Sequence, residues 1–179
     1  MTVFPPGVSM RAAKAGDAAA LAEIYAPHVR RGTATFEVEP PDAAEMERRW
    51  REVSGRGLPY LLAVADGEVL GYAYAAPYRP RAAYRFTLED SIYLRDGARG
   101  KGIGRALLWA LIDAAERAGA RQMIAVIGDT GNAASIGVHA ALGFRHVGVL
   151  SGVGNKFSRW LDVVLMQRAL GRGDGAPAT

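Results

Sequence analysis

A glycine-rich hexapeptide, residues 99–104, lies between a strand-like and a helix-like segment and constrains the fold of this 179-residue chain more than any other feature. Residues 84–94 alternate in the manner of a β-strand. After the hexapeptide, five apolar residues recur at helical spacing: Leu107, Leu108, Leu111, Ile112 and Ala115. The glycines let backbone N–H groups approach a ligand, and the start of the helix adds unpaired N–H donors and a partial positive charge. The sequence therefore predicts a loop that binds a phosphate; a turn that only shapes the connection is the alternative.

Strands and helices alternate along the rest of the chain. Expected strands cover residues 8–12, 60–65, 69–76, 84–94, 123–127, 145–150 and 160–167. Three further helices are expected: one capped by Asp17, one capped by Asp42, and one over residues 133–142. Asp66-Gly67 is a hairpin-turn signal between two of these strands. Pro27 falls inside the first helical pattern, so that helix should kink or break there. Interspersed helices and strands imply an α/β domain with a mixed sheet.

Composition limits the chemistry available to the chain. We expect one domain over residues 8–169, a flexible N-terminus at 1–7 and a disordered tail at 170–179. The chain has no cysteine and three histidines without metal-ligand spacing, so no disulfide, thiolate nucleophile or metal site is expected. Scattered arginines make a nucleic-acid partner unexpected, although the formal charge of +4 suits a phosphate-bearing cofactor. Without a membrane span or a signal-peptide pattern, the protein is assigned to the cytoplasm.

The loop departs from two common phosphate-binding motifs. A P-loop ends in Gly-Lys-Ser/Thr, whereas Gly104 is followed by Arg105, which also replaces the third glycine of the dinucleotide fingerprint. Instead, residues 99–104 resemble the pyrophosphate loop of the GNAT acetyltransferases, Arg/Gln-x-x-Gly-x-Gly/Ala. The segment from Asn132 to Gly143-Phe144 is similar to the GNAT pattern Asn-x-x-Ala-x-x-Leu-Tyr-x-x-x-Gly-Phe, with His139 in place of the tyrosine.

Within that superfamily, residues 8–167 resemble the phosphinothricin and methionine sulfone acetyltransferase branch, in which histidine is usual at position 139. The matching stretches are 72–75, 78–81, 89–94, 125–128 and 159–167. The resemblance implies a GNAT fold, with a mixed, mostly antiparallel central sheet flanked by helices, and acetyl-CoA as the cofactor. It also implies a homodimer to which the late strands contribute. Lys156 and Trp160 belong to the branch signature, but no role is assigned to them.

The resemblance also implies the residues that bind the cofactor. The pyrophosphate is expected on the loop and helix start, formed by Arg99, Gly100, Lys101, Gly102, Ile103, Gly104 and Arg105. Backbone atoms of Ile92, Tyr93 and Leu94 would pair with the pantetheine arm, and Asn132 and Ser135 would contact the same arm. For Asn132, a helix N-cap is the alternative, and both roles are compatible.

Acetyl transfer to an amine needs a base, because most amines are protonated at neutral pH. Glu89 is the candidate base, since strand alternation places it on a polar face; a solvated charge or a salt bridge to Arg85 is the alternative. Asp90 then falls among apolar residues, points away from Glu89 and is expected to be a structural hydrogen-bonding residue; the GNAT resemblance implies a β-bulge there that exposes backbone N–H groups. His139 is expected to protonate the leaving sulfur or relay a proton, with a packed helix histidine as the alternative. His28 and His146 are expected to have no function.

The acceptor is expected to be a small amino acid. Arg79 and Arg81 offer guanidinium groups suited to a carboxylate or sulfone oxygen, and the resemblance favours Arg79; two solvated arginines are the alternative. The remaining expected acceptor-site residues are Phe36, Pro80, Thr87, Glu89, Asp90 and Ser91. Direct attack in a ternary complex is expected, because no cysteine can carry the acetyl group. A protein N-terminal or ribosomal-protein acetyltransferase and a non-catalytic acyl-CoA-binding regulator are the alternative functions.

Overall fold

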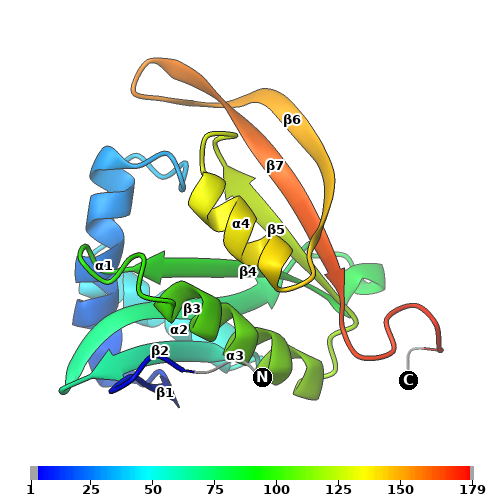
Figure 1. Ribbon diagram of the computed structural model, residues 1–179, viewed down its shortest axis with the longest axis horizontal. Helices are drawn as coiled ribbons and strands as arrows, with labels where there is room; N and C mark the ends of the chain where they lie inside the picture. Colours follow the sequence, from blue (N-terminus) through cyan, green and yellow to red (C-terminus); the bar gives the residue numbers. More distant parts are fainter. Residues whose placement is uncertain (1–3, 178–179) are drawn as a thin grey trace.

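The computed structural model describes residues 4–177, which form one seven-stranded sheet with helices on both faces (Figure 1). The strands are β1 (Ser9–Ala12), β2 (Tyr60–Ala65), β3 (Glu68–Pro77), β4 (Thr87–Leu94), β5 (Gln122–Gly128), β6 (Arg145–Lys156) and β7 (Arg159–Ala169). The helices are α1 (Ala18–Arg31), α2 (Ala43–Ser54), α3 (Ile103–Arg117) and α4 (Ala133–Ala141). The strand order is β1-β2-β3-β4-β5-β7-β6, and every neighbouring pair is antiparallel except β4 and β5. The predicted mixed, mostly antiparallel sheet is confirmed.

The two parallel strands part in the middle of the sheet. β4 and β5 pair from Thr87 opposite Gln122 to Asp90 opposite Ala125, and beyond this point the rest of β4 has no pairing with β5. The predicted bulge at Asp90 is wrong for the pairing with β3, because the β3–β4 register runs without a shift along the whole of β4. The fork between β4 and β5, rather than a bulge, therefore explains why the polar Asp90 lies among apolar residues of β4.

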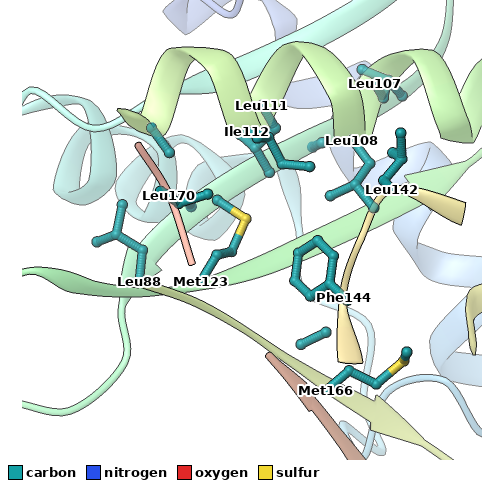
Figure 2. Close-up of a cluster of buried hydrophobic side chains, with 14 of the residues drawn as sticks. Leu88, Leu107, Leu108, Leu111, Ile112, Met123, Leu142, Phe144, Met166 and Leu170 are labelled. Carbon is teal, nitrogen blue, oxygen red and sulfur yellow. The ribbon is translucent and has the colours of Figure 1, made fainter. Parts of the chain in front are cut away.

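Each face of the sheet has its own core. Leu107, Leu108 and Leu111 of α3 are fully buried on one face, where they pack with Met123 of β5 and Phe144 (Figure 2). On the other face, α1 and α2 cover a second cluster that contains four buried aromatic or apolar side chains of the strands: Tyr60, Leu62, Val69 and Tyr72. Side chains of β4 therefore reach α3 and α4 from one face and α1 and α2 from the other.

Local signals in the sequence predicted several boundaries correctly. Asp66 and Gly67 have φ angles of 50° and 80° in the β2–β3 turn, which fits a hairpin turn with two left-handed residues. Asp42 caps α2 by accepting a hydrogen bond from the Glu45 N–H at 2.8 Å. Gly143 follows α4 with φ of 82°, the left-handed conformation that glycine adopts without strain.

Other expectations about the elements were wrong. α1 continues through Pro27 to Arg31 without a break, because the last turn is held by the fully buried Val29. Asp17 does not cap α1 with its side chain; its carboxylate instead accepts hydrogen bonds from Arg11 and from the Lys14 N–H. β4 begins at Thr87 rather than residue 84, since a short 3₁₀ turn over Ala82–Tyr84 precedes it.

The β6–β7 hairpin is longer than the sequence predicted. The two strands reach Lys156 and Arg159, and in Figure 1 the hairpin extends beyond the other strands, past α4. Phe157 and Ser158 form its turn with φ angles of 52° and 56°. Register shifts in the pairing of β6 with β7, between His146 and Gly148 and between Leu150 and Gly154, interrupt the alternation by which the sequence identifies a strand.

The expected flexible ends lie partly outside the described residues, namely residues 1–3 and 178–179. Within the described part, the Phe4 ring packs against Trp109 at 5.9 Å between centroids, and Leu170 is buried in the core. Among residues 4–177, no helix has the length and apolar character needed to cross a membrane.

Candidate active site

A cavity of about 550 Å³ follows the fork between β4 and β5. One end lies at the glycine-rich loop, the middle runs along Ile92, Tyr93 and Leu94, and the other end reaches Asp90 and Ser91. Of the expected cofactor residues, ten line this cavity: Ile92, Tyr93, Leu94, Arg99, Gly100, Gly102, Gly104, Arg105, Asn132 and Ser135. Two expected residues, Lys101 and Ile103, do not line it; the Ile103 side chain is buried in the core and Lys101 is exposed.

The loop at one end of the cavity has the geometry of an anion cradle. Gly100 and Gly102 have φ angles of 74° and 78°, which residues with a Cβ rarely adopt, and Gly102 immediately precedes α3. The first N–H groups of α3 therefore face the loop without partners in the helix. Arg99 and Arg105 add positive charge to the cavity wall, so this end suits a pyrophosphate.

The middle of the cavity exposes an unpaired strand edge. Beyond Asp90, the backbone groups of β4 that face β5 have no strand partner, so an extended ligand can add to this edge in the manner of another strand. Asn132 lies across the fork, where its side chain accepts a hydrogen bond from the Ser135 N–H at 3.2 Å and caps α4. The N-cap alternative is therefore observed, and it leaves Asn132 in the cavity wall.

His28 is a residue of this site that the sequence analysis missed. It lies on α1, lines the cavity, and its Nε2 is 2.9 Å from the Leu94 carbonyl oxygen. Burial lowers the pKa of His28, which leaves the ring neutral with Nε2–H donating to that carbonyl. The available signal was its position one helical turn after Ile24 and Tyr25, both of which are buried.

Glu89, the expected base, lies directly before Asp90 on β4. Its pairing with Ala76 places it on the face of the sheet that α1 and α2 cover, opposite to Leu88 and Asp90. Burial raises the pKa of Glu89, the negative charge of Asp90 raises it further, and Arg79 opposes both effects. In the described part of the chain Glu89 forms no ion pair, and the expected alternative of a salt bridge to Arg85 is wrong, because the Arg85 guanidinium lies 4.3 Å from the centre of the Phe86 ring.

Asp90 and His139 form a buried pair across the fork. His139 Nε2 is 2.9 Å from Asp90 Oδ2, and Nδ1 is 2.7 Å from the Ser135 carbonyl oxygen. The Ser135 hydroxyl oxygen also lies 3.4 Å from Nδ1, so both ring nitrogens have a hydrogen-bond partner. Burial lowers the pKa of His139, but the hydrogen bond and charge of Asp90 and the Ser135 carbonyl outweigh it, and the net pKa is raised. Asp90 Oδ1 is buried without a partner in the described structure.

The two expected acceptor arginines differ in their effect on Glu89. Arg79 and Arg81 are both exposed in the segment between β3 and β4, and Arg79 lies 5.1 Å from the centre of the Tyr78 ring. Arg79 is close enough to lower the pKa of Glu89, whereas Arg81 has no such effect. Phe36 is half-buried and belongs to a loop, residues 32–37, that also contributes Ala34 to the large cavity.

A second cavity, of about 180 Å³, lies beside the same loop on the α1 and α2 side of the sheet. Five of its lining side chains are tyrosines: Tyr25, Tyr60, Tyr72, Tyr74 and Tyr93. Burial raises the pKa of Tyr25 to about 12, so its hydroxyl stays protonated. Tyrosines spaced along strands are typical of a core, so the sequence does not predict a cavity here.

A fork between two parallel strands, with an anion cradle at one end and a buried carboxylate at the other, defines an enzyme that binds a long phosphate-bearing cofactor. The model of the Acetyltransferase (GNAT) family matches residues 20–144, more than half of the chain, and the protein therefore belongs to the GNAT acetyltransferases.

The chain is similar over nearly its full length to individual members of this family. It is 56% identical over 166 residues to a phosphinothricin N-acetyltransferase from Alcaligenes faecalis, covering 93% of this chain and 84% of that protein. It is 43% identical over 170 residues to an L-methionine sulfoximine/L-methionine sulfone acetyltransferase from Pseudomonas paraeruginosa, covering 94% and 98%. A phosphinothricin acetyltransferase from Sinorhizobium meliloti, crystallised with AcCoA, is 47% identical with a TM-score of 0.93 and coverage of 97% and 94%. The predicted superfamily and branch are confirmed.

Proposed function

We propose that the protein transfers the acetyl group of acetyl-CoA to the α-amine of a small amino acid such as phosphinothricin, methionine sulfoximine or methionine sulfone. The observation that carries the proposal is the position of Glu89, half-buried and free of ion pairs in the described chain, directly before Asp90, which lines the cofactor cavity at the fork. The names of the similar proteins give the acceptor class.

The residues of the large cavity fit coenzyme A. The glycine loop with Arg99 and Arg105 would hold the pyrophosphate, and the open edge of β4 at Ile92, Tyr93 and Leu94 would bind the pantetheine arm. Lys101 and the N–H of Ile103 belong to the same loop and helix start, and they complete the expected set of pyrophosphate ligands. Asn132 and Ser135 would contact the arm from the start of α4. When bound, acetyl-CoA supplies an activated acetyl group as a thioester.

Glu89 acts as the general base in this proposal. An α-amine enters mostly as the ammonium form, and a carboxylate with a raised pKa is a stronger base than an exposed glutamate. The amine then attacks directly, since the chain has no cysteine to form an acetyl-enzyme. His139 lies beside Asp90 in the cavity wall, and the hydrogen bond and charge of Asp90 raise its pKa; it is the proposed source or relay of the proton for the departing thiolate.

Arg79 is the proposed ligand for the acceptor's carboxylate or side-chain oxygens, because its charge already acts on Glu89. Phe36 is the proposed aromatic side chain of the acceptor site, because it lies on the loop that contributes Ala34 to the large cavity and its ring lies close to Gly128, which also lines that cavity. Three further members of the acceptor set, Thr87, Asp90 and Ser91, share β4 with Glu89, and the other two, Pro80 and Arg81, share the segment with Arg79.

A panel of acceptors tests the proposal. Purified protein is incubated with acetyl-CoA and with phosphinothricin, methionine sulfoximine, methionine sulfone, the common amino acids and peptides with free N-termini, and the released thiol is measured. Turnover on the small amino acids supports the proposal. Turnover on peptides alone would indicate a protein N-terminal acetyltransferase, and cofactor binding without any turnover would indicate an acyl-CoA-binding regulator.

A homodimer and a cytoplasmic location are part of the same proposal. The β6–β7 hairpin exposes six apolar side chains, with exposed fractions from 43% to 73%: Val147, Val149, Leu150, Val153, Phe157 and Trp160. Such a concentration of apolar surface on one hairpin is typical of an interface. Light scattering of the wild type and of Trp160→Glu tests the dimer, and a monomeric wild type at micromolar concentration would contradict it.

A further inference from the structure

The loop over residues 32–37 is held in place almost entirely by side chains of other elements. In the described chain, residues 33–41 take part in no backbone–backbone hydrogen bond, and only the Gly32 N–H donates to a backbone carbonyl, that of His28. The loop nevertheless reaches the large cavity, which Ala34 lines, and Thr35 bonds to Tyr25, which lines the small one. Movement of the loop would therefore change the wall of the large cavity.

A lysine at the tip of the β6–β7 hairpin bonds to the backbone of this loop. Lys156 Nζ is 2.8 Å from the carbonyl oxygen of Gly32 and 2.8 Å from that of Thr35, more than 120 residues away in sequence. The side chain is only 3% exposed, although its neighbour Phe157 is 51% exposed. A buried ammonium is expensive to maintain unless its protons are bonded, so these two carbonyl oxygens account for its burial.

The rest of the loop is packed against the same hairpin. A Cβ on Gly154 of β6 would lie 2.2 to 2.7 Å from three atoms of the Phe36 ring, so the ring rests directly on the β6 backbone. Gly128 at the end of β5 is also close, with the ring 3.2 Å and the Thr33 carbonyl oxygen 2.5 Å from the position of its Cβ. Two glycines and one lysine thus fix both the backbone and the aromatic side chain of the loop.

Hydrogen bonds from the helices complete the attachment. Tyr25 of α1 bonds to the Thr35 hydroxyl at 2.6 Å and donates to Glu37 at 2.9 Å, and Arg49 of α2 forms two hydrogen bonds with the same Glu37 carboxylate. These groups anchor the end of the loop near α2, whereas Lys156 bonds to the part that carries Ala34 and Phe36. The two attachments are therefore separable by mutation.

We infer that Lys156 is a positioning residue for acceptor recognition: through the Gly32 and Thr35 carbonyl oxygens, it holds the loop with Phe36 against the fork, so that the hairpin tip sets the size of the acceptor site. Lys156 touches neither the large cavity nor Glu89, so its effect passes through the loop. The kinetic part of this inference rests on the proposed amino-acid acetylation, whereas the structural part does not.

Lys156→Met tests the inference, because methionine keeps the unbranched apolar stem and removes all three donors. We expect the KM for the amino-acid acceptor to rise about tenfold, within the range by which residues outside a site modulate binding. The KM for acetyl-CoA should rise less, because Ala34 is the one residue of this loop that lines the cofactor cavity and the glycine-rich loop is attached elsewhere. Amide hydrogen exchange at Gly32 and Glu37, whose N–H groups bond to the His28 carbonyl oxygen and the Thr35 hydroxyl, should accelerate while exchange in α3 is unchanged. Lys14→Met, which alters an exposed lysine, is the matched control and should change none of these quantities.

Two results would overturn the inference. Unchanged exchange at Gly32 and Glu37 together with an unchanged acceptor KM would show that Lys156 does not hold the loop. A parallel rise of both KM values with faster exchange throughout the chain would show a general loss of stability. If Lys156→Met fails to fold, Gly154→Ala provides the test instead. Its Cβ displaces the Phe36 ring, so the KM for the acceptor should again rise more than the KM for acetyl-CoA. If the wild type acetylates no amino acid, the proposed function fails, but the exchange experiment still tests the attachment.

Discussion

Replacing the carboxylate of Glu89 by an amide is the most direct test of the site. Glu89→Gln keeps the shape of the side chain and removes the base. A positioned general base contributes roughly 100- to 10,000-fold to the rate, equivalent to about 2.7 to 5.4 kcal/mol of activation free energy. We expect kcat/KM for the acceptor to fall by at least about 100-fold, with binding of acetyl-CoA unchanged, since Glu89 does not line the cofactor cavity.

The pH dependence provides a second readout with a defined sign. Glu89 must be ionised to accept a proton, so activity of the wild type falls as the pH drops through its pKa. Burial and the charge of Asp90 raise this pKa, which places the acidic limb above the usual range of a glutamate. In Glu89→Gln this limb should disappear, and the activity gap to the wild type should narrow at high pH, where the free amine is abundant.

The Tm of Glu89→Gln shows whether a loss of activity comes from removal of the carboxylate or from unfolding of the protein. A carboxyl group whose pKa is raised in the folded state destabilises that state at pH values above its unfolded pKa, because the unfolded chain ionises more easily. Glu89→Gln should therefore have a Tm at pH 7 equal to or above that of the wild type. Glu47→Gln, on the outer part of α2 in an i,i+4 pair with Arg51, is the matched control and should leave kcat/KM unchanged. Retention of more than about a tenth of the wild-type kcat/KM, with the acidic limb intact, would refute the role of Glu89.

Three further predictions address the cofactor loop, the acceptor ligand and the buried pair. Gly102→Ala should weaken acetyl-CoA binding about 5- to 30-fold by calorimetry, because φ of 78° costs a residue with a Cβ about 1–2 kcal/mol; unchanged affinity would contradict the anion cradle. Arg79→Gln should raise the acceptor KM about tenfold and Arg81→Gln by less, and the reverse order in steady-state kinetics would exchange their roles. For His139→Gln, the raised folded pKa means that the stability contributed by His139 is fully present below about pH 6.5 and is lost as the pH rises through the folded pKa. The difference in Tm from the wild type should therefore be larger near pH 6 than near pH 9, and a constant difference would indicate an uncharged ring in the pair with Asp90.

Features encoded by neighbouring residues were predictable from the sequence. The Asp66-Gly67 turn, the Asn132 cap and the left-handed Gly143 each depend on the local backbone, so a few letters are enough to predict them. The glycine loop was predictable for the same reason, because both the turn and the start of α3 lie within six residues.

Features that depend on contacts between distant segments were not predictable in this way. Asp90 and His139 are 49 residues apart, and Lys156 is 124 residues from Gly32, so no spacing rule connects them. Asp90 looked out of place on its strand because its partner lies on another element, and the proposed bulge was the wrong local explanation for a long-range hydrogen bond. The extent of β6 was missed for a related reason: bulges and outward apolar residues obscure its alternation.

The position of Asp90 also explains how one strand supports two parts of the site. Successive residues of a strand point to opposite faces, so Glu89 faces α1 and α2 while Asp90 bonds to His139 of α4. A slip of one residue would exchange the two carboxylates and bury Glu89 against α3. The uninterrupted pairing with β3 and the buried bond to His139 both oppose that slip. The Asp90–His139 pair therefore fixes the direction of Glu89 as well as joining the two sides of the fork, and the proposed base is oriented by its neighbour on the strand.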